Sequence, residues 1–225
     1  MSAVTAPTPR RRPAPLRPRP PASPKLAPGR FLTSEQFLEW LEPGLHADLL
    51  GGEIHMHSPV NLRHANLVNF LDHFLRSFLE EHPLGALHRE TVAVRLSIRD
   101  TFLPDLCYFT KAQAGRLLPT HAPFAPTFVA EVLSPATAGN DRQRKFAAYE
   151  LHGVQEYWIL DPEGGDHRFY RRAGDMLAEF AAGAPRIESA SIPGFALRRD
   201  WLNPDRLPRV ADCLAKLRRA ASRRR

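Results

Sequence analysis

The chain has 225 residues, of which 43% are hydrophobic and 24% charged, so it resembles an average globular protein and is long enough to bury a core without metal or disulfide crosslinks. No apolar run approaches the roughly 20 residues that span a bilayer, and the Arg/Pro-rich start has no apolar signal segment, so we expect neither membrane insertion nor secretion. Two cysteines, Cys107 and Cys213, cannot supply a disulfide framework or a four-ligand zinc site, and they favour a reducing, cytoplasmic location.

The net charge of +7 is concentrated at the two ends of the chain. Residues 1–30 hold seven basic and no acidic residues, and residues 216–225 hold six basic and no acidic residues. Without these 13, the body of residues 31–215 has 18 basic and 24 acidic residues, a net charge of −6. The cationic ends could bind a polyanion in a salt-dependent way, or they could only increase solubility.

Proline and glycine divide the first third of the chain. Nine prolines predict that residues 1–30 are disordered, because such a segment can neither form a helix nor bury a core. Thr33 and Gln36 predict the cap of a short helix that ends at Pro43 and Gly44. Further on, we expect a hairpin of strands 47–50 and 53–56 around Gly51–Gly52, and then a long amphipathic helix over residues 61–81.

Strands dominate the next part of the chain. Alternating apolar and polar residues predict a strand over 92–98, and the more uniformly apolar stretches 103–109 and 127–133 suit the middle of a sheet. The remaining elements that we expect are a helix over 140–151, a strand over 155–161, a hairpin of 166–172 and 176–180, and an amphipathic helix that includes residues 207–217 and runs into the basic tail.

Two acidic residues interrupt the apolar strands. Asp105 follows Pro104 at the start of one strand, and Glu131 lies within the next. Burying an ionised carboxylate costs several kcal/mol unless the carboxylate is paired or binds a cation. Each acid therefore requires either an arginine partner or a metal ion.

The predicted helix over 140–151 carries three further polar residues on one face. Asp141, Lys145 and Tyr149 follow one another at intervals of four residues. An Asp–Lys pair at this spacing is common on exposed surfaces and contributes only tenths of a kcal/mol there. Alternatively, the face carrying Lys145 could point at the two acids.

These stretches together resemble a known family. The chain is similar to the restriction-endonuclease-like PD-(D/E)XK nucleases, in particular the bacterial Uma-two group, from about Phe31 to Trp201. The matching stretches are Asp48 to Glu53, Ser58–Pro59, His64, Pro104–Asp105, Glu131 to Pro135, Asp141 to Lys145 with Tyr149, and Gly153 to Pro162. The resemblance implies a mixed α/β fold with a central mixed β-sheet flanked by helices.

The resemblance also implies a Mg²⁺-dependent phosphodiester hydrolase, with Mn²⁺ as a substitute ion. Asp105 and Glu131 would be the metal ligands, and Asp48 stands where the family usually has Glu. The superfamily places its lysine two residues after the acid, but Leu133 occupies that position here. The resemblance implies that Lys145 on the following helix takes this role and positions the attacking water or stabilises the phosphorane.

Histidine and tyrosine side chains are further candidates for the site. His64 matches a recurrent family histidine and could bind phosphate or metal, or it could cap or pack. Tyr149 could contact the substrate or pack in the core. His55, His57 and His64 lack a fourth ligand, so we expect no zinc site.

The sequence therefore predicts a metal-dependent DNA endonuclease that acts through Asp48, Asp105, Glu131 and Lys145. The alternative is a non-catalytic nucleic-acid-binding or assembly protein on the same fold, and the sequence leaves the oligomeric state open, a homodimer included. We expect three segments: a disordered tail over 1–30, a nuclease domain over 31–203, and an amphipathic helix with a basic tail over 204–225.

Overall fold

A computed structural model of the protein describes residues 31–135 and 138–222. The predicted disorder of residues 1–30 and the last basic residues, 223–225, lie outside the described residues.

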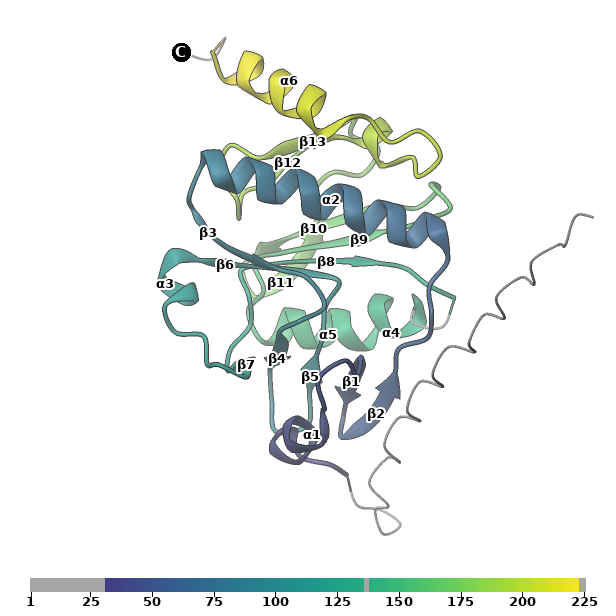
Figure 1. Ribbon diagram of the computed structural model, residues 1–225, viewed down its shortest axis with the longest axis vertical. Helices are drawn as coiled ribbons and strands as arrows, with labels where there is room; N and C mark the ends of the chain where they lie inside the picture. The colour runs from purple at the N-terminus through teal and green to yellow at the C-terminus, as the bar shows by residue number, and fades with distance from the viewer. Residues whose placement is uncertain (1–30, 136–137, 223–225) are drawn as a thin grey trace, which may run out of the picture.

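A six-stranded mixed sheet forms the centre of the protein (Figure 1). Its order is β11-β10-β9-β8-β6-β3, and every neighbouring pair is antiparallel except β8 and β9, which are parallel. The strands are β3 (Gly85–His88), β6 (Leu106–Thr110), β8 (Phe128–Val132), β9 (Glu156–Leu160), β10 (Arg168–Ala173) and β11 (Met176–Glu179). The two middle strands, β8 and β9, are buried along their whole length, which explains why they are apolar apart from Glu131 and Glu156.

Helices cover both faces of this sheet. The long helix α2 (Leu62–Glu81) lies across one face, and α4 (Ala138–Arg142) and α5 (Arg144–Leu151) lie on the other (Figure 1). α2 buries Leu67, Leu71, Phe74 and Phe78 at helical spacing. The crossover through α4 and α5 is what allows β8 and β9 to be parallel.

A second sheet of five short strands packs beside α1 (Ser34–Trp40). Its order is β2-β1-β5-β4-β7, with β1 (Ala47–Leu50), β2 (Glu53–Met56), β4 (Ala93–Arg95), β5 (Thr101–Phe102) and β7 (His121–Ala122). The hairpin of β1 and β2 turns at two glycines with positive φ. At Gly52 a β-carbon would lie 2.4 Å from Cβ of Phe31, so only glycine fits there.

The chain passes from one sheet to the other at Pro104 and Asp105. β5 ends at Phe102 in the second sheet, and β6 begins at Leu106 in the central sheet. Proline suits this corner because it has no N–H to donate to a ladder. The change of sheet places Asp105 at the junction of the two sheets.

The last part of the chain adds a hairpin of β12 (Arg186–Glu188) and β13 (Ala196–Arg198), a 3-10 turn (Arg199–Leu202) and α6 (Val210–Ser222). Cys213, Leu214 and Leu217 of α6 belong to the same buried cluster as the apolar face of α2. Glu156 of β9 is fully buried and accepts hydrogen bonds from Trp158 Nε1, Ser189 Oγ and the amides of residues 190 and 191. α6 therefore packs against α2, and the segment between β12 and β13 is hydrogen-bonded to the central sheet.

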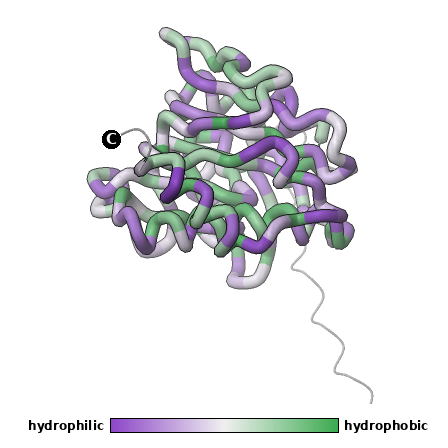
Figure 2. Tube along the Cα trace, turned by 90° about the horizontal axis from the view of Figure 1, so that it is seen from above, coloured by the Kyte–Doolittle hydropathy of each residue, from purple (hydrophilic) through white to green (hydrophobic). Residues whose placement is uncertain are grey.

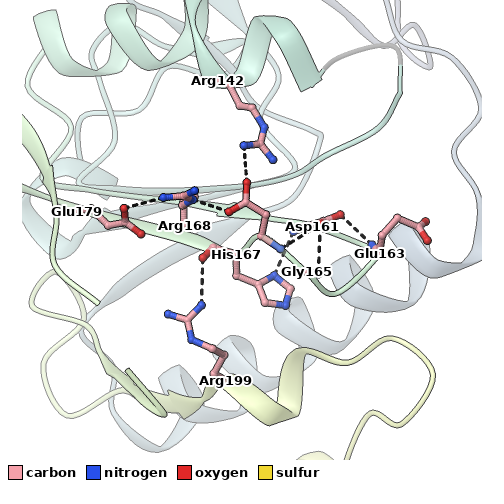
Figure 3. A network of polar contacts seen from close by, with 9 residues as sticks. Arg142, Asp161, Glu163, Gly165, His167, Arg168, Glu179 and Arg199 are labelled. Carbon is pink, nitrogen blue, oxygen red and sulfur yellow. Dashed lines mark hydrogen bonds and ion pairs between the residues drawn. The ribbon is translucent and has the colours of Figure 1, made fainter. Parts of the chain in front are cut away.

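A polar network fixes the turn between β9 and β10 (Figure 3). The Asp161 carboxylate accepts hydrogen bonds from the amides of Glu163, Gly165 and Asp166. Asp166 in turn binds Arg142 of α4 at 2.7 Å. The turn thus anchors the helix that carries Asp141.

Most predicted elements are confirmed, with two differences of extent. The helix predicted over 140–151 is broken at Gln143, whose φ of −124° and ψ of −71° are not helical. The strand predicted over 92–98 stops at Arg95, because Asp100 accepts a hydrogen bond from the Ser97 side chain and closes a turn.

Hydrophobic and hydrophilic residues are interspersed along the chain (Figure 2). Within residues 31–135 and 138–222, none of the helices combines the length and the apolar character needed to cross a lipid bilayer.

Candidate active site

The ammonium group of Lys145 is the centre of a buried cluster of acids. Lys145 lies in the first turn of α5, and its side chain is 3% exposed. Its Nζ lies 2.8 Å from Asp48 Oδ2, 3.0 Å from Glu131 Oε1 and 3.3 Å from Asp141 Oδ1. The interpretation of Asp141 and Lys145 as an exposed surface pair is therefore wrong, because both side chains are buried.

One hydrogen bond joins Asp105 to Glu131, and a second joins Asp105 to the next residue, Val132. The amide of Asp105 donates to Glu131 Oε2 at 3.0 Å, and the amide of Val132 donates to Asp105 Oδ2 at 2.7 Å. This arrangement arises because β6 and β8 are neighbours in the central sheet. The two acids on different strands therefore have fixed positions relative to each other.

Asp48 reaches this cluster from the second sheet. Its Oδ1 accepts a hydrogen bond from the amide of Leu103 at 2.8 Å, and its Oδ2 faces Lys145 and His57. Burial opposes ionisation of Asp48, but Lys145 and His57 more than offset it and lower the pKa of Asp48 to about 2. Asp48 is thus a carboxylate that stays ionised and holds the lysine.

Tyr149 lies behind Glu131, one turn after Lys145. Its side chain is fully buried and its hydroxyl donates to Glu131 Oε1 at 3.1 Å. Tyr149 was predicted to contact the substrate, but in the structure it is not among the residues that line the adjacent cavity. Its contact with Glu131 indicates that it positions this carboxylate.

His64 lies in the first turn of α2, whose N-cap is Asn61. Its Nε2 is 3.5 Å from Asp105 Oδ2, and its buried Nδ1 has no hydrogen-bond partner among the described residues. Burial disfavours the imidazolium of His64, but the neighbouring Asp105 outweighs this and raises the pKa. The predicted His64 therefore lies at the site, beside one of the two predicted metal ligands.

The cluster contains more acidic than basic groups. Burial, together with Asp141, Asp105 and Asp48, raises the pKa of Glu131, although Lys145 acts in the opposite direction. Burial also disfavours the charged form of Lys145, but the surrounding carboxylates raise its pKa well above the ordinary value. With all four acids ionised, the single ammonium group leaves an excess of negative charge, which a bound cation would reduce.

A cavity of about 650 Å³ gives access to the cluster. Its polar lining includes His64, Asp105, Glu131, Asp141 and Lys145. Three acids, the lysine and the neighbouring histidine are therefore reached from the same cavity. Asp105 has the most accessible carboxylate of the site, with a side chain that is 16% exposed.

His57 is a residue of the site that the sequence analysis dismissed. Its Nε2 lies 3.0 Å from Asp48 Oδ2, and it lines the same cavity. The register of the predicted hairpin would have placed His57 near Asp48. Because Asp48 pairs with His55 across β1 and β2, His57 lies diagonally opposite Asp48 on the same face.

The donor atoms at the site are carboxylate oxygens, the kind of ligand that Mg²⁺ and Mn²⁺ prefer. Among the described residues, no group of three or more His, Cys, Asp or Glu side chains is arranged to hold a metal ion, since Lys145 occupies the space between three of the carboxylates. Mg²⁺ commonly binds through one or two carboxylates, with water and substrate phosphate completing its coordination. Asp105 and Glu131 supply such oxygens beside the cavity.

Comparison with known proteins gives a consistent result. A model of the Uma2 family, described as "Putative restriction endonuclease", matches residues 34–203. A crystal structure described as a "putative nuclease belonging to DUF820" from Anabaena variabilis ATCC 29413 has a similar fold, with a TM-score of 0.64 and 18% sequence identity over 76% of this chain and 97% of that chain. No curated protein matches this chain at a significant level.

Proposed function

The chain belongs to the Uma2 family, and from this premise we propose that it is a metal-dependent nuclease that hydrolyses phosphodiester bonds in DNA. The observation that carries the proposal is the meeting of Asp105, Glu131 and Lys145 in one cavity. Two carboxylates on neighbouring strands and one lysine are the groups that such a hydrolysis requires.

Asp105 and Glu131 would hold Mg²⁺ or Mn²⁺ through their carboxylate oxygens. When bound, the ion supplies a Lewis acid that lowers the pKa of coordinated water and offsets charge on the phosphate. Lys145 donates hydrogen bonds from Nζ, and we assign it to orienting the attacking water or to stabilising the negative charge that develops on the phosphate.

Asp48, Asp141 and Tyr149 act on these groups indirectly. Asp48 and Asp141 keep Lys145 protonated and in place, and the Tyr149 hydroxyl fixes one oxygen of Glu131. His64 lies close enough to Asp105 to hold a phosphate oxygen or the metal beside it. In the reaction, a bond forms between the water oxygen and phosphorus and the bond to the leaving oxygen breaks, while the attacking water loses a proton to solvent and the leaving oxygen takes one up from solvent.

The alternative is a protein on the same fold that binds nucleic acid without cleaving it. The buried acids argue against this alternative, because carboxylates repel phosphates and a binding surface gains nothing from concentrating them.

The test is cleavage of plasmid and single-stranded DNA by the full chain in Mg²⁺, Mn²⁺ or EDTA, with Asp105→Ala beside wild type. Asp205→Ala is the matched control, because Asp205 is an exposed acid outside the cavity. We expect cleavage by wild type and by the control only with metal, and none by Asp105→Ala. Equal activity of Asp105→Ala and wild type would contradict the assignment of the site.

A further inference from the structure

The cavity at the acid cluster has an apolar part as well as a polar part. The outer apolar lining includes Pro43 and Leu45 before β1, Met56 at the end of β2, and Pro59 and Val60 before α2, and the buried Leu103 and Val132 also line the cavity. Met56 and Val60 are 44% and 45% exposed. Apolar surface left open to solvent beside a reactive site is typical of a place where part of the ligand packs.

The size of the cavity limits what can reach the acids. Its volume of about 650 Å³ lies in the range of pockets for small molecules, roughly 300–1,000 Å³. Glu131 and Lys145 lie at its base with side chains only 4% and 3% exposed. A nucleotide fits such a space, whereas in an intact duplex the base beside the scissile phosphate is stacked and paired and must be extruded before it can enter the cavity.

The charge of the cavity lining also disfavours duplex DNA. Among the described residues, the lining contains no arginine, one lysine and three histidines, against five acids: Glu42, Glu90, Asp105, Glu131 and Asp141. Three arginines lie near site residues in the sequence, and each is bound to another group. Arg63 is bound to Glu163 and Asp205, Arg142 to Asp166, and Arg144 to the Leu50 carbonyl. Duplex DNA carries about one charge per 1.7 Å of axis, against about 3.4 Å for one strand, so an acidic lining opposes a duplex more strongly.

We propose that the substrate is an unpaired nucleotide, either in a single strand or extruded from a duplex. The scissile phosphate lies at Asp105 and Glu131, and a neighbouring base packs against Met56 and Val60. This inference rests on the proposed nuclease function and adds the class of substrate to it.

The first test compares three oligonucleotides of the same sequence: single-stranded, fully paired, and paired with one bulged nucleotide. With Mn²⁺ we expect the single-stranded and bulged forms to be cleaved at least about tenfold faster than the paired form. Equal or faster cleavage of the paired form would overturn the substrate class while leaving the nuclease function intact. Cleavage of none of the three would refute the nuclease function instead.

Binding provides a readout that does not require cleavage. Fluorescence anisotropy of the full chain with fluorescein-labelled strands in EDTA should give a Kd about tenfold lower for the single strand than for the duplex. A duplex that binds as tightly as the single strand would contradict the proposal even if no oligonucleotide is cleaved.

The second test removes the proposed contact between a base and the apolar lining, first by changing the protein and then by omitting the base. The Met56→Ala/Val60→Ala double variant should have a Kd and a KM for oligothymidylate about tenfold higher than those of wild type. This change lies within the range of about 1–3 kcal/mol that a base contact contributes. For wild type, Kd and KM should rise by a similar factor when an abasic strand of the same length replaces oligothymidylate. On the abasic strand, the double variant should bind only slightly more weakly than wild type. Leu62→Ala is the matched control, because Leu62 is 80% exposed and outside the cavity lining. A wild type that binds and cleaves the abasic strand as well as oligothymidylate would refute the base contact.

Discussion

Lys145 of α5 and Asp48 of β1 form a buried ion pair, with 2.8 Å between Nζ and Oδ2, that joins the helix on the central sheet to the second sheet. Both side chains are 3% exposed. The charge of each therefore depends on the other, and the pair is both a structural contact between two layers and part of the candidate site.

Lys145→Met should destabilise the protein markedly. The substitution leaves three carboxylates buried without their ammonium partner, and breaking a buried ion pair in this way typically costs about 3–5 kcal/mol. Urea unfolding followed by circular dichroism measures the loss. Lys111→Met, at an exposed lysine of α3 (Lys111–Ala114), should cost less than about 0.5 kcal/mol.

The same variant tests catalysis at a temperature where circular dichroism shows it folded. Removing a preorganised charge from the reaction should reduce the single-turnover rate by about two to three orders of magnitude. Lys145→Arg should not restore the rate, because a planar guanidinium is broader than the ammonium that fits between the acids. A folded Lys145→Met protein with a rate within about threefold of wild type would exclude a catalytic role for Lys145.

Asp48→Asn should change how stability depends on pH. Lys145 and His57 hold the pKa of Asp48 at about 2, against 3.8 in the unfolded chain, once the opposing effect of burial is included. The stability that this shift contributes is present above the unfolded pKa and is lost as the pH falls toward 2. The difference in unfolding free energy between wild type and Asp48→Asn should therefore shrink by about 2 kcal/mol between pH 5 and pH 2. A difference that stays constant over this range would contradict the ionised state assigned to Asp48.

Asp105→Asn should abolish stabilisation by metal without unfolding the protein. The amide oxygen of Asn can still accept the hydrogen bond from the Val132 amide, and the loss of one negative charge relieves repulsion with Glu131. At a metal concentration 100 times Kd, binding stabilises a protein by about 2.7 kcal/mol, which is a rise of several degrees in Tm for wild type. Differential scanning fluorimetry with Mg²⁺ and Mn²⁺ measures this shift, and Asp205→Asn is the control that should keep it. Strong destabilisation by Asp105→Asn would instead support a purely structural role for the acid.

Tyr149→Phe separates positioning from substrate contact. The variant loses one buried hydrogen bond to Glu131, which should cost about 1 kcal/mol of stability. If Tyr149 only positions Glu131, kcat falls severalfold and KM for DNA stays near the wild-type value. A raised KM with unchanged kcat would show that Tyr149 contacts the substrate after all. Tyr170→Phe, a partly buried tyrosine of β10, should match wild type in both constants.

The elements that the sequence predicted well are those specified by local pattern. The Gly51–Gly52 turn and the flanking apolar residues were sufficient for the β1–β2 hairpin, and helical spacing of apolar residues was sufficient for α2. Asp105 and Glu131 could be recognised as site candidates because each is an acid in an apolar stretch.

Other features depend on contacts between distant parts of the chain. The strand predicted over 103–109 begins only at Leu106, because the chain passes from the second sheet to the central sheet at Pro104 and Asp105. The sequence did not predict β3, because its four residues have no alternating pattern and the strand pairs with the distant β6. The burial of Lys145 could not be decided from spacing alone, since the same interval between Asp141 and Lys145 occurs on exposed helices.

The hydrogen bonds that the Glu131 and Asp105 carboxylates accept make two amide protons intrinsic reporters of the site. The amide of Asp105 points at the Glu131 carboxylate, and the amide of Val132 points at the Asp105 carboxylate. Their NMR chemical shifts should therefore follow the ionisation of each acid separately, and their exchange with deuterium should slow or quicken when an ion competes for the carboxylate oxygens. Occupancy of the site can thus be followed in the resting protein without a label and without a substrate.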